Sequence, residues 1–169
     1  MLRAATTLQL PVYITTQSRA KLGHTVPELQ KHIQGPNVRA DVDKTLFSMV
    51  TPEVRALLPT PNPQNAEGTL DVIIFGIETH ICVTQTTLDL LALGHRVYIP
   101  VDGVSSINPE ERGIALARLR DAGAVVTSSE SLLFEILGDA GHEAFRAVSG
   151  LVKETKEETK SALGAFSKI

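Results

Sequence analysis

One residue of this chain combines a reactive side chain with a reactive position. Cys82 is the single cysteine among 169 residues. It lies in the segment GIETHICV, which follows the apolar run at residues 71–75 and opens a stretch with helical spacing. The positive end of a helix dipole favours thiolate over thiol, and free N–H groups at such a turn can hold an oxyanion. The position therefore predicts a nucleophile, with a buried, unreactive cysteine as the alternative.

Strand-like and helical patterns alternate around and beyond this segment. Short apolar runs typical of buried strands are followed by stretches with apolar residues every three or four positions, which are typical of helices. The expected strands are residues 12–16, 71–75, 96–101 and 124–126, and the expected helices are residues 26–33, 51–58, 81–93, 109–122, 129–137 and 145–152. This order predicts an α/β fold, a three-layer α/β/α sandwich with a mainly parallel, Rossmann-like sheet. Such sheets bind ligands at the carboxyl ends of their strands, where Cys82 is expected.

Three segments between these elements have a weaker pattern. Residues 34–42 contain Gly35, Pro36 and Asn37 and are predicted to be a connection. Residues 43–50 fit either a strand or an extended loop. Residues 59–69 contain three prolines, which indicates a surface loop.

The composition argues against several classes of protein. Sixteen Lys and Arg against nineteen Asp and Glu give a net charge of −3, so we expect no nucleic-acid partner. No run is long and apolar enough for a membrane span, so we expect no membrane partner. A lone thiol cannot form an internal disulfide, which indicates a reducing, cytoplasmic location. A mitochondrial location is the alternative, because residues 1–27 contain basic residues and no acid.

Neither a metal nor a cofactor is expected. The histidines are scattered, with no pair at the i, i+4 spacing of a helical metal site, and no phosphate-binding or dinucleotide-binding glycine motif occurs. His80 is the histidine beside Cys82. It could act as a base or a ligand, but we expect it to line the mouth of the pocket.

Segments over about residues 2–153 resemble one protein family. The segments are PVYITTQ, LGHTVPEL, DKTLFSMV, GIETHICV, TTLDLL, ALARLRDAGA, TSSESLLFEILGDA and FRAVSGLVKE. Together they are similar to the isochorismatase-like cysteine hydrolases, and within them to the subgroup of isochorismatase domain-containing protein 2. The resemblance implies one hydrolase domain at residues 1–153, followed by a charged tail at residues 154–169.

The resemblance also implies roles for individual residues. Cys82 matches the nucleophile of an Asp, Lys, Cys triad, and Lys44 matches the lysine, whose charge would favour thiolate. A cis peptide is implied between Ile77 and Glu78, and the N–H groups of Glu78 and Cys82 match an oxyanion hole. Further residues are expected to line the pocket, namely Gln17, Thr79 and His80.

The family's aspartate has no match in this chain. The resemblance places it on a first strand near the N-terminus, and Met1 to Arg3 correspond to the end of the helix after that strand. We therefore expect a domain without its first, central strand, with lower stability or with the gap filled by another segment or subunit. Asp102, which ends a strand at the reactive edge, is the best candidate to replace the missing base. Asp43 is expected to face away from Lys44.

Two functions follow from these expectations. The first is a cysteine hydrolase of a small polar metabolite, with Cys82 as nucleophile and with activity impaired if the base is missing. The alternative is a non-catalytic scaffold or regulatory member of the family, so that enzyme activity is left open. A homo-oligomer is expected in either case, with Leu163, Phe166 and Ile169 docked on a neighbouring subunit.

Overall fold

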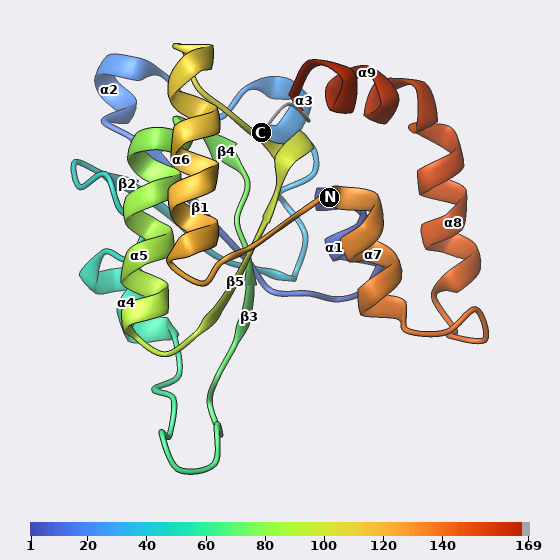
Figure 1. Ribbon diagram of the computed structural model, residues 1–169, viewed down its shortest axis with the longest axis horizontal. Helices are drawn as coiled ribbons and strands as arrows, with labels where there is room; N and C mark the ends of the chain where they lie inside the picture. Colours follow the sequence, from blue (N-terminus) through green and yellow to red (C-terminus); the bar gives the residue numbers. More distant parts are fainter. Residues whose placement is uncertain (167–169) are drawn as a thin grey trace.

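The computed structural model describes residues 1–166, in which helices cover both sides of a central group of strands (Figure 1). The helices on one side are α4 (Pro52–Leu57), α5 (Thr84–Ala92) and α6 (Pro109–Asp121). Those on the other side are α1 (Leu2–Thr7), α7 (Ser129–Leu137) and α8 (Phe145–Glu154). This arrangement confirms the predicted α/β/α sandwich.

Every strand pair is parallel, as the alternation of strands and helices predicts. β1 (Val12–Gln17) pairs with β2 (Val38–Lys44). β5 (Arg96–Pro100) lies between β3 (Asp71–Ile73) and β7 (Val125–Thr127), and β4 (Gly76–Ile77) pairs with β6 (Val104–Ser105). Within residues 1–166, no ladder of hydrogen bonds joins these three groups into one sheet.

The strand β2 corrects the prediction for residues 34–42. The expected connection ends at Asn37, and the strand begins at Val38 and continues to Lys44 with alternating burial. The sequence VRADVDK alternates between apolar or small and charged residues, which is the period of a half-buried strand. Its register places Lys44 opposite Gln17, at the carboxyl ends of β1 and β2.

Two hydrophobic cores hold the layers together, one on each side of the strands. The larger core packs β5 against α5 and α6 and includes Val97, Ile99, Leu116 and Leu119, none more than 1% exposed. The smaller core packs α1 against α7 and α8 through Ala4, Leu133, Leu137 and Val148. Each helix layer therefore buries an apolar face of its own.

Short elements connect the layers. They are α2 (Arg19–Leu22), α3 (Pro27–Gln30), the π-helical turn η1 (Thr79–Val83) and the 3₁₀ turn η2 (Val101–Gly103). The loop at residues 59–69 protrudes from the body as predicted (Figure 1). Among the described residues, no helix is both long and apolar enough to cross a membrane.

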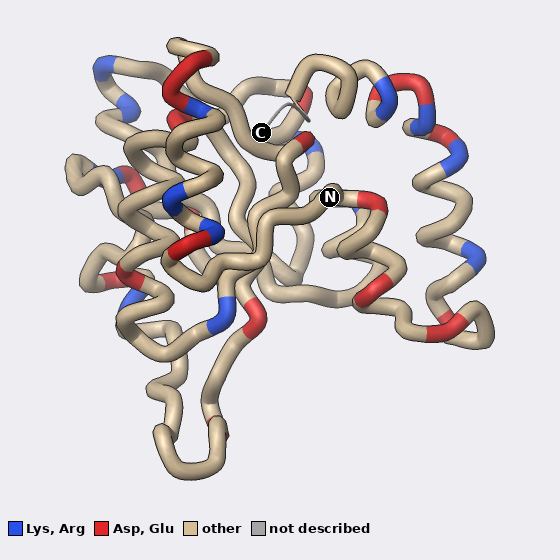
Figure 2. The backbone as a smooth tube through the Cα atoms, viewed as in Figure 1, with Lys and Arg blue, Asp and Glu red and all other residues tan. Residues whose placement is uncertain are grey.

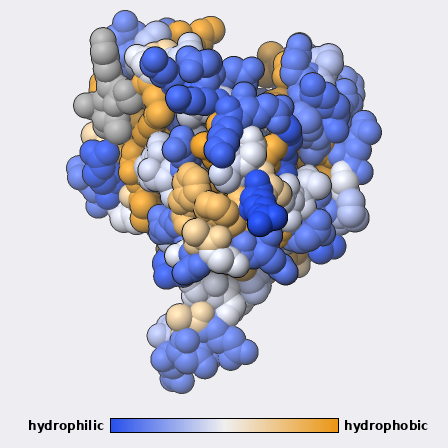
Figure 3. Space-filling view, turned by 90° about the vertical axis from the view of Figure 1, so that its right-hand side faces the viewer, coloured by the Kyte–Doolittle hydropathy of each residue, from blue (hydrophilic) through white to orange (hydrophobic). Residues whose placement is uncertain are grey.

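Most of the expected charged tail is helical. α8 ends at Glu154, and α9 (Lys156–Phe166) follows, with charged residues along both helices (Figure 2). The face of the molecule on this side carries mostly hydrophilic groups with apolar patches between them (Figure 3). Leu163 packs against the larger core, and the Phe166 carbonyl accepts a hydrogen bond from Arg112. These two residues thus contact their own chain, and Ile169 lies outside the described residues.

Candidate active site

Cys82 lies in a wide turn at the carboxyl end of β4. The turn η1 connects β4 to α5, and Glu78 before it has a left-handed backbone, with φ 61° and ψ 69°. The N–H groups of Ile81 and Val83 both donate to the Glu78 carbonyl, at 3.0 and 3.2 Å. Such a backbone costs a non-glycine residue about 1–3 kcal/mol and is concentrated at functional sites. The turn leaves the thiol of Cys82 free and partly exposed.

The cis peptide implied between Ile77 and Glu78 is absent. No peptide bond among residues 1–166 is cis, so this prediction is wrong for the structure. The unusual backbone at this point is the positive φ of Glu78, 61°. Within the described residues, the N–H groups of Glu78 and Cys82 donate to no carbonyl outside η1.

The Lys44 ammonium is held by three oxygen atoms. Its Nζ donates to Oε1 of Gln17 at 2.7 Å and to the carbonyls of Leu46 and Phe47, both at 2.9 Å. These bonds use all three N–H groups of the ammonium. Because Lys44 is only 6% exposed, it presents a fixed charge to its surroundings rather than a free donor.

The electrostatics of Lys44 show two opposing influences. Burial lowers the pKa of the Lys44 ammonium from its ordinary value, because the charged form loses solvation. The negative charges of Cys82 and Asp43 oppose this shift. Lys44 and Cys82 are therefore close enough to interact by charge.

Thr86 ties the two halves of the site together. Its hydroxyl donates to the Cys82 carbonyl at 2.6 Å and accepts from the N–H of Met49 at 2.9 Å. The loop that follows Lys44 is thereby fixed to the helix that follows Cys82. Thr86 is 2% exposed and was not among the expected site residues, although it lies one helical turn after Cys82.

His80 lies in a second cluster. Its Nδ1 lies 3.0 Å from the Ser106 hydroxyl and 3.5 Å from Oε2 of Glu78. The Glu78 carboxylate also accepts from the N–H of Ile107, at 3.3 and 3.4 Å to its two oxygens. The His80 side chain is 19% exposed.

Two of the residues that were expected to line the pocket make hydrogen bonds within the protein instead. Thr79 is fully buried, with its hydroxyl donated to the Ser105 carbonyl at 3.0 Å, so it cannot line a pocket. Gln17 contacts Lys44 through Oε1 and the Thr45 carbonyl through Nε2, at 2.8 Å. Gln17 therefore positions Lys44.

The carboxylates that could serve as a base are engaged elsewhere. Asp43 accepts from the Thr16 hydroxyl at 3.0 Å and from the Arg19 N–H at 2.8 Å, so it faces away from Lys44 as expected. Asp102 accepts from the N–H of Ser129 at 2.8 Å and from its hydroxyl. Asp102 thus holds the start of α7, and the expectation that it replaces the missing base is wrong.

Exposed apolar side chains follow three of the strands at this edge. Leu46 and Phe47 come after β2, Ile77 ends β4, and Ile107 comes after β6, and each is at least half exposed. Sequence reasoning missed this apolar rim because its residues come from three segments that are far apart in the chain. It offers contact area to a bound molecule.

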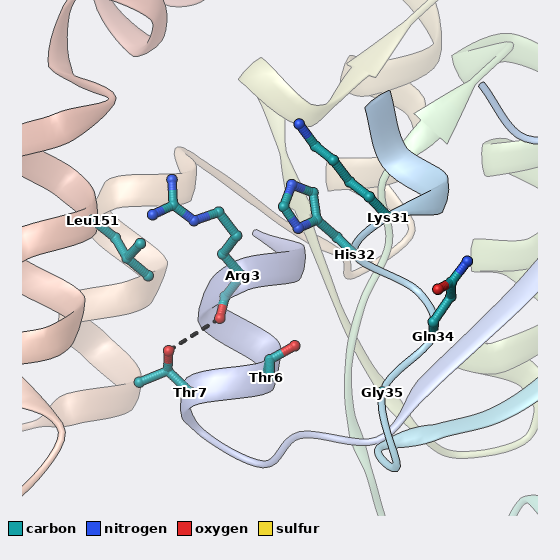
Figure 4. A pocket seen from close by; sticks show the side chains of 8 residues that line it. All are labelled: Arg3, Thr6, Thr7, Lys31, His32, Gln34, Gly35 and Leu151. Carbon is teal, nitrogen blue, oxygen red and sulfur yellow. Dashed lines mark hydrogen bonds between the residues drawn. The ribbon is translucent and has the colours of Figure 1, made fainter. Parts of the chain in front are cut away.

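Other candidate sites lie away from Cys82. A hollow of about 400 Å³ is lined by residues of α1, α8 and the chain after α3, and Figure 4 shows Arg3, Lys31 and His32 around it. No lining residue comes from η1 or β2. Among residues 1–166, no group of three His, Cys, Asp or Glu side chains is arranged to hold a metal ion.

Comparison with known proteins identifies the family. The model of the isochorismatase domain matches residues 1–131. The chain belongs to the isochorismatase family. It is 44% identical over 155 residues to the secreted isochorismatase effector Isc1 of Phytophthora sojae, a match that covers 91% of this chain and 71% of the effector.

Two further family members extend this comparison. Isochorismatase domain-containing protein 2 of Xenopus laevis is 41% identical over 154 residues, which cover 91% of this chain and 70% of that protein. A solved structure described as the MAR1 ribonuclease of Caenorhabditis elegans has a TM-score of 0.80 and 36% identity, over 89% of this chain and 73% of its own. The resemblance to the family and to its domain-containing protein 2 members is thus confirmed.

Proposed function

We propose that the protein is a cysteine hydrolase of a small polar metabolite, with Cys82 as the nucleophile. The observation that supports this proposal is the buried ammonium of Lys44, which three hydrogen bonds fix in place and which interacts by charge with Cys82. A cation held beside a partly exposed thiol favours the thiolate, which is the reactive form. Family membership supports the same chemistry.

The reaction proceeds through a thioester in two steps. The Cys82 thiolate attacks the carbonyl carbon of the substrate, and the resulting oxyanion accepts hydrogen bonds from the N–H groups of Glu78 and Cys82. The carbonyl re-forms, and the leaving group departs with the bonding electron pair and takes a proton from solvent. Water then attacks the thioester carbon, the carbon–sulfur bond breaks to return the thiolate, and the product is a carboxylic acid, with the second water proton released to solvent. Lys44 contributes by its charge, because its three N–H groups are already used.

A non-catalytic family member is the second candidate. The observation that favours it is the engagement of both Asp43 and Asp102 with other partners, which leaves Cys82 without a carboxylate base in the described residues. For either candidate, a homo-oligomer and a cytoplasmic location remain predictions, and light scattering tests the first of them.

Thiol alkylation and a substrate screen separate the two candidates. We expect iodoacetamide to modify Cys82 at least tenfold faster than it modifies glutathione at neutral pH. We also expect the wild-type chain to hydrolyse members of a panel of small amides and esters, and Cys82→Ala to hydrolyse none. RNA belongs in the panel because the Caenorhabditis elegans structure is described as a ribonuclease. A Cys82 no more reactive than glutathione, together with no hydrolysis, would favour the scaffold.

A further inference from the structure

We infer that the hollow between α1, α8 and the chain after α3 is a second binding site, which takes the phosphate group of a small phosphate monoester. The hollow has a volume of about 400 Å³, within the range of known ligand pockets. Its lining contains the basic side chains of Arg3, Lys31 and His32, and none of the described residues that line it is acidic. None of them belongs to η1 or β2, so the inference is independent of the function proposed for Cys82.

The basic side chains reach the hollow from two sides (Figure 4). Arg3 lies on α1, and Lys31 and His32 lie on the chain that follows α3. Because like charges repel, a group of basic side chains around one space is stabilised by an anion that occupies it. The whole chain has a net charge of −3, so this local excess of basic groups is not a general property of its surface.

The walls of the hollow are fixed to one another. On one side, α1 packs against α8 in the smaller core, through Ala4 and Val148. On the other side, Nδ2 of the buried Asn37 donates to the Leu10 carbonyl at 3.0 Å, and the Asn37 carbonyl accepts from the N–H of Val12 at 2.9 Å. These bonds hold the chain after α3 against the segment that leads from α1 into β1. The site is therefore preformed, which lowers the cost of binding a ligand.

The donors around the hollow suit a phosphate group better than a carboxylate. Neither Lys31 nor His32 takes part in the ion pairs of residues 1–166. A lysine ammonium offers three N–H donors, and a neutral imidazole offers one. A phosphate monoester carries up to two negative charges and three strong acceptor oxygens, whereas a carboxylate has one charge and two oxygens. A phosphate can thus accept from several of these side chains at once.

Arg3 is already paired, and this pairing orients its guanidinium. Its Nη1 and Nη2 donate to the two carboxylate oxygens of Glu154, at 2.8 and 2.7 Å. These bonds use two of the five N–H groups of a guanidinium, which leaves the others for a ligand. The acids whose charges act on Arg3 are Glu154 and Glu158, and neither lines the hollow. Arg3 therefore offers donors in a fixed orientation, while Lys31 supplies the uncompensated charge.

The size of the hollow indicates an organic phosphate. A space of about 400 Å³ exceeds what a free phosphate ion fills, since a water molecule takes about 30 Å³ of the liquid. Leu151 of α8 adds an apolar part to the lining (Figure 4). The ligand class is therefore a phosphate carried by a small organic group.

Calorimetric titration of phenyl phosphate into the full chain tests this inference. We expect saturable binding, and no binding of benzyl alcohol, a neutral molecule of similar size, at the same concentrations. Lys31→Met should weaken the binding of phenyl phosphate about tenfold, because it removes a charge-assisted hydrogen bond. Lys21→Met is the matched control, since Lys21 is exposed and lies outside the lining, and it should bind as wild type.

Glu154→Gln tests the part that Arg3 plays. This variant keeps the size of the side chain and removes a negative charge beside Arg3, so the binding of phenyl phosphate should tighten about threefold at low salt. Unchanged or weaker binding would mean that Arg3 does not contact the phosphate, and the site as described would be overturned.

Three further results would overturn the inference. Equal affinity of wild type and Lys31→Met would place the bound phosphate elsewhere on the molecule. Equal affinity for benzyl alcohol and phenyl phosphate would mean that the hollow does not select an anion. An absence of saturable binding up to about 10 mM phenyl phosphate would leave no site of useful affinity.

A membrane is the other source of the same phosphate group. Vesicles of phosphatidylcholine and phosphatidic acid present a phosphate monoester at a lipid surface, and we expect the protein not to sediment with them. Binding to these vesicles without binding to phenyl phosphate would overturn the assignment to a small ligand.

Discussion

Lys44 and His80 are the two basic side chains in the elements around Cys82, and the structure holds them in different ways. Lys44 with its hydrogen-bond partners is called the Lys44 flank, and His80 with Ser106 and Glu78 is called the His80 flank. Lys44 is 6% exposed, and oxygen atoms occupy all of its N–H groups. His80 is 19% exposed and is held from one side only, through Nδ1. The Lys44 flank therefore fixes a charge in place, while the His80 flank leaves one nitrogen open to exchange a proton with solvent.

This difference shows that two basic side chains in one region can be suited to different tasks. A charge that favours thiolate acts best when it is fixed and desolvated, because a low local dielectric strengthens its field. A base must instead gain and lose a proton in each turnover, which requires access to water. An ammonium held by buried hydrogen bonds suits the first task. An imidazole with one nitrogen open to solvent suits the second.

The largest expected effect comes from removing the fixed charge. Lys44→Met should slow the alkylation of Cys82 by iodoacetamide about tenfold, because the thiolate loses the charge of the Lys44 ammonium. It should also lower the free energy of unfolding by about 3 kcal/mol, since Gln17 and two carbonyls lose their buried donor. Alkylation rates and urea unfolding measure the two effects.

Lys21→Met provides the control for this variant. Lys21 is exposed, so its replacement should change neither quantity. If Lys44→Met reacted with iodoacetamide as fast as wild type, Lys44 would be a structural residue only, and the contrast between the flanks would be lost.

The order of elements could be predicted from the sequence because most of them have a clear period. The apolar run before Cys82 and the helical spacing after it correspond to β3, β4, η1 and α5. The strand β2 was missed because the turn residues before it dominated the pattern of residues 34–42. In VRADVDK, the alternation that marks a half-buried strand is carried by few apolar residues.

The identities of the site residues were easier to predict than their contacts. Cys82 stands out by type and position, and Lys44 by resemblance to the family. The bond from Lys44 to Gln17 joins residues 27 positions apart and depends on the register of β1 on β2, which no local pattern contains. The left-handed Glu78 was also unpredictable, because most residues with positive φ are glycines.

A smaller effect is expected from the residue that joins the two parts of the Lys44 flank. Thr86→Val removes the hydroxyl that bridges the Cys82 carbonyl and the Met49 N–H. The free energy of unfolding should fall by about 2 kcal/mol, because both backbone groups lose a partner. The alkylation of Cys82 should slow by less than in Lys44→Met, since the ammonium is still present.

Thr86→Ser keeps the hydroxyl and is the matched control. It should remain close to wild type in alkylation rate and lose less stability than Thr86→Val. Equal losses in the two variants would mean that the methyl group of Thr86, rather than its two hydrogen bonds, maintains the site.

The smallest expected effect is a change in how stability depends on pH. Burial lowers the pKa of Lys44 from its ordinary value of 10.5, so the unfolded chain binds more protons than the folded chain between the folded-state pKa and 10.5. The contribution of Lys44 to the free energy of unfolding should therefore rise with pH through that window and stay constant below it. Urea unfolding of Cys82→Ser with and without Lys44→Met, from neutral pH to about pH 10, isolates this rise from the titration of the thiol. The rise should be present with Lys44 and missing with methionine. A fall instead would mean that the negative charge of Asp43 outweighs burial, and the Lys44 flank would then be stabilised by its charge instead of being held against a desolvation penalty.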